Sequence, residues 1–223
     1  MIGKLGNYRV VDLTKKIVPG QMGRRCEIRI NYSERTDDYN CDLDIMSHLG
    51  THVEAPYHWD LDWKDVSDLP ATAYMGRCVM LKITDIEPAG KITAAHMDTA
   101  DGDRVRQGDI VLVDTPHHLP PFSYPEKEIR PYVNAEMGQW LVDKGVKCVG
   151  FADGVDIETN VPEFQEFHRV AMAHDITFIE VLENFDELEQ DVFFLSALPL
   201  PFKGLDSCPV RVVALEGIPG FNK

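Results

Sequence analysis

The stretch that decides the fold is "NAEMGQWLVDKGVKCVGFAD", residues 134–153, where a helical pattern is followed at once by a strand pattern. Apolar residues recur at helical spacing through residues 140–142, and the dipeptide "KG" ends the run. Residues 146–151, "VKCVGF", form a short apolar run typical of a buried strand. This helix–strand step predicts an α/β fold.

A second step of the same kind follows in residues 161–182, "VPEFQEFHRVAMAHDITFIEVL". Its pattern predicts a helix over 166–173, a turn near "HD" and a strand over 176–182. Alternating charged and apolar residues in 25–34, "RCEIRINYSE", predict a half-buried strand. We also expect a short helix over 92–100 and further strands in 8–14, 76–86, 108–116 and, twice, in 191–217.

The bulk composition limits the class of protein. The 223 residues show no repeat or linker, so we expect one domain spanning 1–223, mainly sheet with a few helices on its surface. The net charge is −15 and no basic cluster stands out, which argues against a nucleic-acid partner. No apolar run is long enough for a membrane span. Five cysteines without a CxxC pair fit reduced thiols and a cytoplasmic protein.

The stretch "SHLGTHVEAPYH", residues 47–58, holds the strongest functional signal. A metal site, a proton-transfer site and a polar loop are the three interpretations. Gly50 and Pro56 argue against a helix and favour an extended or looped strand. In an extended chain the even-numbered His48, His52, Glu54 and His58 would project to one side. His48, His52 and Glu54 can then converge on zinc, manganese or iron(II). His58 would be a fourth ligand or a general base.

Completing groups come from the second helix–strand step. Glu180 shares strand parity with apolar residues, where a carboxylate is costly to bury unless it is paired or bound to a metal. His168 lies on the preceding helix, and a helix-surface role is the alternative. We expect the pair His117 and His118, beside "LPPFSYP", to border a site. We interpret His96 and His174 as structural or exposed.

The segment "HLGTHVEAPYH" resembles the HxGTHxDxPxH signature of the metal-dependent cyclase family, which includes bacterial kynurenine formamidase and isatin hydrolase. The resemblance extends to "VVDLT", "GDIVLVDT", "WLVDKGVKCVGFADGVDIE", "FHRVAMAHDITFIEVLENFDEL" and "ALPLPFKGLDSCPVRVVAL". It implies a swivelling β/β/α domain, with a central mixed β-sheet or barrel-like core and a few peripheral helices. It also implies a homodimer or homotetramer.

The resemblance implies roles for individual residues as well. His48, His52 and Glu54 would bind a first metal, and Glu54, His168 and Glu180 a second, with one or two Zn²⁺ or Mn²⁺ ions per chain. His58 would be the catalytic acid/base. Two positions depart from the family pattern: Glu54 stands where aspartate is usual, one methylene longer, and Gly154 in "GFADGVDIE" stands where serine is common.

The hypothesis for function is metal-dependent hydrolysis of an amide-type bond in a small molecule. An arylformamidase acting on N-formylkynurenine comes first, and a hydrolase that opens cyclic amides or lactones, as isatin hydrolase does, is the alternative. Trp59, Trp63 and Tyr57 could form an aromatic wall for a flat substrate, with core packing as the other interpretation. A non-catalytic metal-binding or ligand-binding protein is a hypothesis of a different class.

Overall fold

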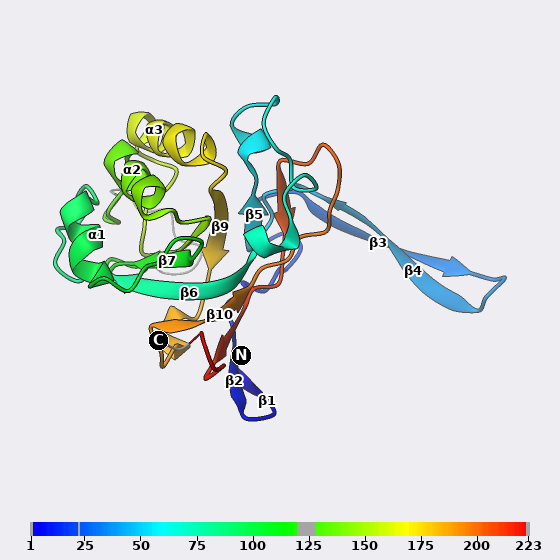
Figure 1. Cartoon of the computed structure of the whole chain (residues 1–223). Helices are drawn as coiled ribbons and strands as arrows, with labels where there is room; N and C mark the ends of the chain where they lie inside the picture. The colour runs from blue at the N-terminus through cyan, green and yellow to red at the C-terminus, as the bar shows by residue number, and fades with distance from the viewer. Residues whose placement is uncertain (1, 22, 120–127, 222–223) are drawn as a thin grey trace.

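The computed structural model describes residues 2–21, 23–119 and 128–221, and a ten-stranded mixed sheet dominates it (Figure 1). The four consecutive strands β6 to β9 run parallel, and the strands on both sides of them pair antiparallel. The predicted mixed sheet is confirmed. In spatial order its strands are β1 (Ile2–Leu5), β2 (Tyr8–Asp12), β12 (Val213–Glu216), β10 (Val192–Ser196), β6 (Met75–Lys82), β7 (Ile110–Asp114), β8 (Cys148–Ala152), β9 (Thr177–Leu182), β5 (His52–Glu54) and β11 (Ser207–Pro209).

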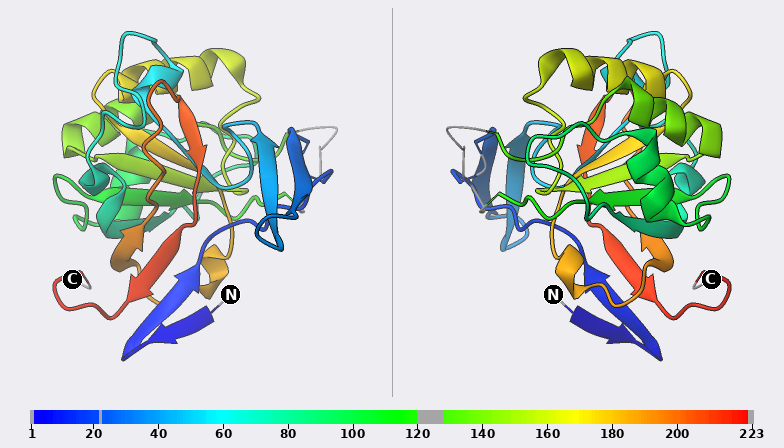
Figure 2. Two further views of the ribbon diagram at one scale, coloured as in Figure 1. Left: turned by 90° about the vertical axis from the view of Figure 1, so that its right-hand side faces the viewer. Right: turned by 90° about the vertical axis from the view of Figure 1, so that its left-hand side faces the viewer.

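The α-helices of the described residues gather on one side of this sheet (Figures 1 and 2). They are α1 (Ala94–Asp101), α2 (Ala135–Lys144) and α3 (Val161–Met172), with short 3₁₀ turns η1 (Pro56–His58), η2 (Ala71–Ala73) and η3 (Phe185–Glu187). The Asn134 side chain caps α2, and Gly145 ends it at φ 67°. The predicted helices are confirmed, although α3 begins five residues before 166, because Pro162 fits its first turn. No helix among the described residues is long and apolar enough to cross a membrane.

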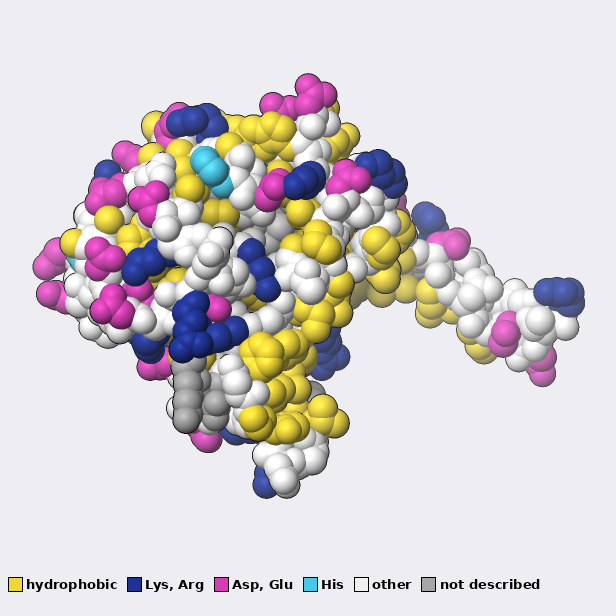
Figure 3. Space-filling model, in the orientation of Figure 1, with side chains coloured by type: hydrophobic (Ala, Val, Ile, Leu, Met, Phe, Trp, Pro, Cys, Tyr) yellow, Lys and Arg dark blue, Asp and Glu magenta, His cyan; other side chains and the backbone are white. Residues whose placement is uncertain are grey.

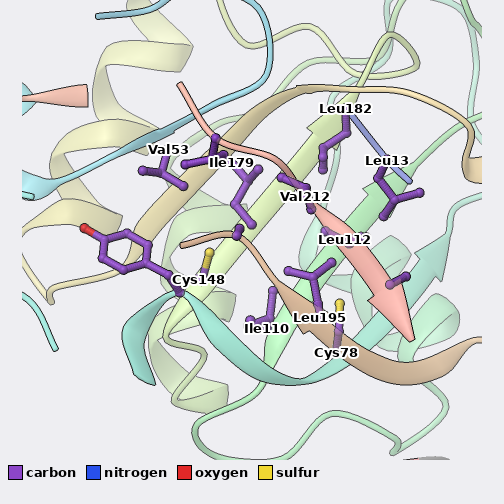
Figure 4. Packing of buried hydrophobic residues seen from close by; sticks show 14 of the residues in the cluster. Leu13, Val53, Cys78, Ile110, Leu112, Cys148, Ile179, Leu182, Leu195 and Val212 are labelled. Carbon is purple, nitrogen blue, oxygen red and sulfur yellow. The ribbon is translucent and has the colours of Figure 1, made fainter. Parts of the chain in front are cut away.

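The central strands are buried on both faces, which explains their continuous apolar runs. Val79, Val111 and Phe178 pack beneath the helices, and the neighbouring Cys78 and Ile110 point to the opposite face. On that second face the sheet curls back on itself, so that Thr14, just after β2, bridges to Leu182 at the end of β9. Figure 4 shows the cluster enclosed by this curl, which makes the core barrel-like as expected.

A separate two-stranded ribbon leaves the body (Figure 1). Its strands are β3 (Cys26–Ser33) and β4 (Asp38–Ile45), paired antiparallel along their whole length. The predicted strand over 25–34 is confirmed, but the expectation that it is half-buried is wrong, since residues 27–32 are all exposed. The alternation produces one apolar and one polar face, and the described part of this chain leaves the apolar face uncovered.

Candidate metal centre

The histidine stretch does not form one extended strand. His52 and Glu54 lie on β5, but His48 lies in the turn before it and His58 is the last residue of η1. Gly50 makes the turn with φ 60°, in the left-handed region that glycine adopts without strain. Of the extended and looped forms expected, the structure shows the looped one, and the turn and η1 bring all four side chains together.

Glu54 is the centre of the cluster, and its side chain is 3% exposed. Its Oε1 lies 2.8 Å from Nδ1 of His48 and 3.5 Å from Nε2 of His52, and its Oε2 lies 3.8 Å from Nε2 of His168. Burial alone would raise the pKa of this carboxyl, but the surrounding histidines, His168 first, hold it well below its usual range. The side chain is a buried carboxylate ringed by imidazoles.

In the neutral form that binds a metal, backbone carbonyl groups fix the tautomers of His52 and His168. Nδ1 of His52 donates to the Gly50 carbonyl at 2.7 Å, and Nδ1 of His168 donates to the Phe164 carbonyl at 2.8 Å. A carbonyl only accepts, so each Nδ1 carries the hydrogen and each Nε2 is left facing Glu54. Metal-binding histidines are usually oriented by this kind of second hydrogen bond.

A bulge in β9 lies beside Glu180. The register between β8 and β9 shifts between Gly150 and Ala152, and Val181 has φ 58°, which is strained for a β-branched residue. The Thr51 hydroxyl donates to the Val181 carbonyl at 2.7 Å and holds the bulge. Glu180 is paired with His52 across β5 and β9, with Oε2 3.4 Å from Nε2 of His52. Bulges of this kind re-aim side chains next to functional sites.

The donor atoms fit a divalent cation. Within the described part of the chain, Nε2 of His52 and Oε2 of Glu54 are buried and make no hydrogen bond. Donor atoms of His48, His52 and Glu54 all lie within 4.8 Å of one another, and so do those of Glu54, His58 and His168. Imidazole nitrogens and carboxylate oxygens together suit zinc or manganese. Glu54 belongs to both sets.

The second set differs from the one that the family resemblance implies. The structure groups His58 with Glu54 and His168, whereas Glu180 approaches His52. Glu180 therefore faces the first set of donors, and its side chain is 6% exposed.

Asp206 joins the cluster and was missed by sequence reasoning. Its Oδ2 accepts from Nε2 of His48 at 2.8 Å and lies 3.4 Å from Nδ1 of His58. Burial would raise the pKa of this carboxyl, but the contacts with His48 and His58 lower it. In the sequence it is an ordinary loop aspartate in "KGLDSCP", and only the antiparallel pairing of β11 with β5 brings it to the site.

Two hydrogen bonds fix the position of Asp206. The Ala55 amide donates to the Asp206 carbonyl at 2.9 Å. Two residues earlier, the Gly204 amide donates to the buried carboxylate of Asp65 at 2.6 Å. The segment carrying Asp206 is thus tied to β5 on one side and to the loop after η1 on the other.

Without a bound metal ion, the neighbouring carboxylates keep His48 and His52 protonated. Burial lowers the pKa of His48, but hydrogen bonds to Asp206 and Glu54 outweigh it and raise the pKa to about 9. Burial likewise lowers the pKa of His52, and Glu180 and Glu54 raise it to about 10. A cation that binds here must displace these protons.

His58 connects the cluster to solvent. Its side chain is 32% exposed, and its Nε2 lies 3.9 Å from Oε1 of Glu54. Of the three aromatic residues expected near it, Trp59 lies beside His168, with ring centroids 6.0 Å apart. Trp63 packs against the core beneath the helices. Tyr57 is half-buried, and its amide donates to the Lys64 carbonyl.

The remaining histidines have other surroundings. His118 lines a cavity of about 550 Å³ at the carboxyl ends of the parallel strands, and none of the cluster residues lines it. Nε2 of His117 donates to the Ile86 carbonyl, and residues 120–125 of the adjoining loop lie outside the described residues. His96 belongs to the capping box of α1, and Nδ1 of His174 donates to the Val170 carbonyl, which confirms structural roles.

Packing explains the glycine at position 154. A Cβ at Gly154 would lie 2.5 Å from Oδ1 of Asp114 and 2.9 Å from the Thr115 carbonyl oxygen. Both distances are shorter than carbon–oxygen contacts allow, so a serine would require the backbone to move.

Comparisons with known proteins agree with this fold. Residues 11–159 match a family described as Cyclase, putative cyclase. Kynurenine formamidase from Bacillus cereus is 29% identical over 179 residues, covering 77% of each chain. The enzyme of that name from Erythrobacter litoralis is 27% identical over 180 residues, covering 78% of this chain and 76% of the relative.

Solved structures show the same fold. A potential metal-dependent hydrolase with cyclase activity has a TM-score of 0.74 at 23% identity, covering 94% of this chain and 98% of that one. Isatin hydrolase A from Ralstonia solanacearum also has a TM-score of 0.74, at 22% identity, covering 94% of this chain and 92% of that one.

Proposed function

Because the chain belongs to the putative cyclase family, we propose that it is a metal-dependent hydrolase of carbon–nitrogen bonds other than peptide bonds. Arylformamides are the first proposed class of substrate. The relatives named kynurenine formamidase support this reaction class. The observation that carries the proposal is the buried Glu54 carboxylate, with His48, His52 and His168 around it and two donor atoms left without hydrogen bonds among the described residues.

His48, His52 and Glu54 would hold a first cation with Glu180 beside them, and Glu54 and His168 would hold a second. Zinc and manganese are the proposed ions, one or two per chain. A bound divalent cation lowers the pKa of a water molecule toward neutrality and polarises a carbonyl oxygen.

His58 is the proposed general acid and base. Asp206 lies against Nδ1, so Nε2 is directed toward Glu54 and the interior of the site. His58 takes a proton from the attacking water at Nε2 and later returns it to the leaving nitrogen. Water adds to the formyl carbon, the carbon–nitrogen bond breaks, and the products are formate and an aryl amine.

An aromatic ring beside the cluster supports a flat substrate. Trp59 lies beside His168 and offers an aromatic surface at the site. N-formylkynurenine is the first proposed substrate, which would place the enzyme in tryptophan breakdown. A cyclic amide such as isatin is the second, and the fold shared with isatin hydrolase A is compatible with it.

We also propose that the protein works in the cytoplasm on a small molecule as a homodimer or homotetramer. The cysteines of the described residues are all free thiols, as a reducing compartment requires. No membrane or nucleic-acid partner is proposed.

A substrate screen tests the proposal. The zinc-loaded and manganese-loaded protein is incubated with N-formylkynurenine, with isatin and with a simple lactone, each with and without a chelator. Release of formate that stops on chelation is the expected result. Chelator-sensitive opening of isatin without formamide turnover would favour the second substrate, and bound metal with no turnover of any compound would favour a non-catalytic metal-binding protein.

A further inference from the structure

Asp65 is a buried carboxylate in a loop that is mostly in contact with solvent. The loop follows η1 and spans residues 59–70, and the side chain of Asp65 within it is only 3% exposed. Burying a carboxylate is costly unless hydrogen bonds replace its water. Both oxygens of Asp65 receive such bonds, Oδ1 from its own loop and Oδ2 from the segment between β10 and β11. Asp65 therefore joins two parts of the chain that are far apart in sequence.

The Oδ1 atom of Asp65 shapes its own loop. It accepts from the Ser67 amide and the Ser67 hydroxyl, each at 2.8 Å, and from the Asp68 amide at 3.0 Å. An aspartate that accepts from the amide two residues ahead forms an Asx turn. This turn fixes the side chain of Asp65, so that its Oδ2 is left to bind a group outside the loop.

The Oδ2 atom of Asp65 holds the backbone of residues 203–206, here called the 203–206 segment. The Gly204 amide donates to Oδ2 at 2.6 Å. At the next residue of each strand of contact, the Val66 amide donates to the Leu205 carbonyl at 3.1 Å. The segment is thus bonded to the loop at two successive residues, immediately before the aspartate that contacts the histidine cluster.

The same loop also supports the backbone beside His58. The Tyr57 amide donates to the Lys64 carbonyl at 2.9 Å, one residue before Asp65. Figures 1 and 2 show the loop after β5 beside the segment between β10 and β11. Both partners of the contact between Asp206 and His58 are therefore attached around Asp65. His58 is attached through the Lys64 carbonyl, and Asp206 through the carboxylate of Asp65.

We propose that Asp65 is a positioning residue for the proposed hydrolysis, holding Asp206 within reach of His58 by fixing the 203–206 segment. The inference rests on the proposed function, in which His58 is the general acid and base. Asp65 takes no chemical step itself and acts through Asp206.

The two contacts of Asp206 with histidines tolerate displacement to different extents. Its Oδ2 lies 2.8 Å from Nε2 of His48, which is an ordinary hydrogen-bond distance. The same atom lies 3.4 Å from Nδ1 of His58, close to the upper limit for a hydrogen bond. A shift of about 0.5 Å away from His58 would break this longer contact. Loss of Asp65 should therefore affect the proposed acid/base more than the proposed metal ligand.

The ion pairs of Lys203 are a weaker link between the same two parts of the chain. Its Nζ lies 3.0 Å from Oδ2 of Asp65 and 2.8 Å from Oδ1 of Asp68, but its side chain is 74% exposed. Figure 3 shows acidic and basic side chains next to one another in the upper half of the view, on the solvated surface. Exposed ion pairs contribute little to stability. The bond from the Gly204 amide is the stronger link, and the exposed Asp68 supplies a matched control.

Asp65→Asn tests the proposal. The groups bonded to both oxygens of Asp65 are donors, and asparagine offers only one accepting oxygen, so either the turn or the Gly204 amide loses its partner. We expect kcat to fall about tenfold, with little change in KM or in bound zinc. Asp68→Asn should match wild type in all three quantities. Circular dichroism verifies that both variants are folded.

The histidine ring signals in nuclear magnetic resonance spectra separate positioning from general damage. The signal of His58, identified by its loss in His58→Ala, should move in Asp65→Asn and stay in place in Asp68→Asn. These spectra need no substrate. A wild type without turnover would therefore contradict the proposed function alone, whereas an unmoved His58 signal in Asp65→Asn would overturn the role of Asp65.

A double variant tests whether Asp65 acts through Asp206. If it does, Asp65→Asn combined with Asp206→Asn should be about as slow as Asp206→Asn alone, because both changes weaken one contact. Losses in kcat that multiply would overturn the inference. Should Asp65→Asn fail to fold, hydrogen exchange of the wild type decides. The Gly204 amide should be strongly protected, and exchange at the rate of a free amide would equally overturn the inference.

Discussion

The carboxylate of Asp206 accepts a hydrogen bond from Nε2 of His48 at 2.8 Å, although Asp206 takes no chemical step in the proposed reaction. The same oxygen lies 3.4 Å from Nδ1 of His58. One carboxylate thus orients a proposed metal ligand and the proposed acid/base, as is common around metal centres.

We expect Asp206→Asn to lower kcat by about 10-fold to 100-fold, because the orientation of His58 is weakened. The KM should change little, and the pH profile of kcat should shift. Asp62→Asn, an exposed change in the neighbouring loop, is the control and should match wild type. An unchanged pH profile with a lower thermal stability would assign Asp206 a purely structural role.

His58→Ala should lower kcat by about 10²-fold to 10⁴-fold, because the proton carrier is lost. The protein should keep the first proposed cation, since His48, His52 and Glu54 are unchanged. The control is His174→Ala, which removes an exposed histidine in the turn after α3, whose Nδ1 donates to the Val170 carbonyl. Turnover is measured beside metal content, and a His58→Ala protein with full activity would contradict the role.

Two substitutions at Glu54 should separate the effect of its negative charge from the effect of its side-chain length. Glu54→Gln leaves buried imidazolium groups without their carboxylate, so the free energy of unfolding of the metal-free protein should fall by about 3 kcal/mol. Metal binding should weaken as well. Glu54→Asp keeps the charge with the shorter side chain usual in the family, and should retain metal. Chemical denaturation and metal titration measure the two effects, and a Gln variant that binds metal as wild type does would contradict the central role of Glu54.

Metal affinity should rise with pH. The pKa of His48 is raised to about 9 and that of His52 to about 10, so both are protonated in the metal-free protein at pH 7. Displacing two protons predicts an affinity increase of about 100-fold per pH unit up to pH 9. The stabilisation that these cations give the metal-free protein is present below pH 6.5 and is lost as pH rises through 9 to 10. Calorimetry in buffers of different ionisation enthalpy counts the protons, and an affinity independent of pH would contradict the assignment.

Local patterns predicted most of the elements, because capping residues and apolar periodicity act over a few residues. Gly145 ends α2 as expected, Asn134 caps its start, and the helix–strand steps form β8 and β9. The predicted burial of residues 25–34 is wrong, because alternating charged and apolar residues create an apolar face but do not show whether anything covers it.

The site was predictable where its residues are adjacent in sequence or lie on an identifiable helix–strand step. His48, His52, Glu54, His168 and Glu180 do converge. The bulge that aims Glu180 and the strand pairing that delivers Asp206 depend on contacts between distant segments, such as Ser207 opposite Glu54. No local pattern encodes such contacts.

The most direct test is the metal content of the purified protein. After dialysis against zinc or manganese and removal of free ions, elemental analysis is compared between wild type and His52→Ala. The account predicts one or two ions per wild-type chain and a clear loss in the variant. A wild-type protein that takes up neither ion would contradict the claim that this cluster is a metal centre.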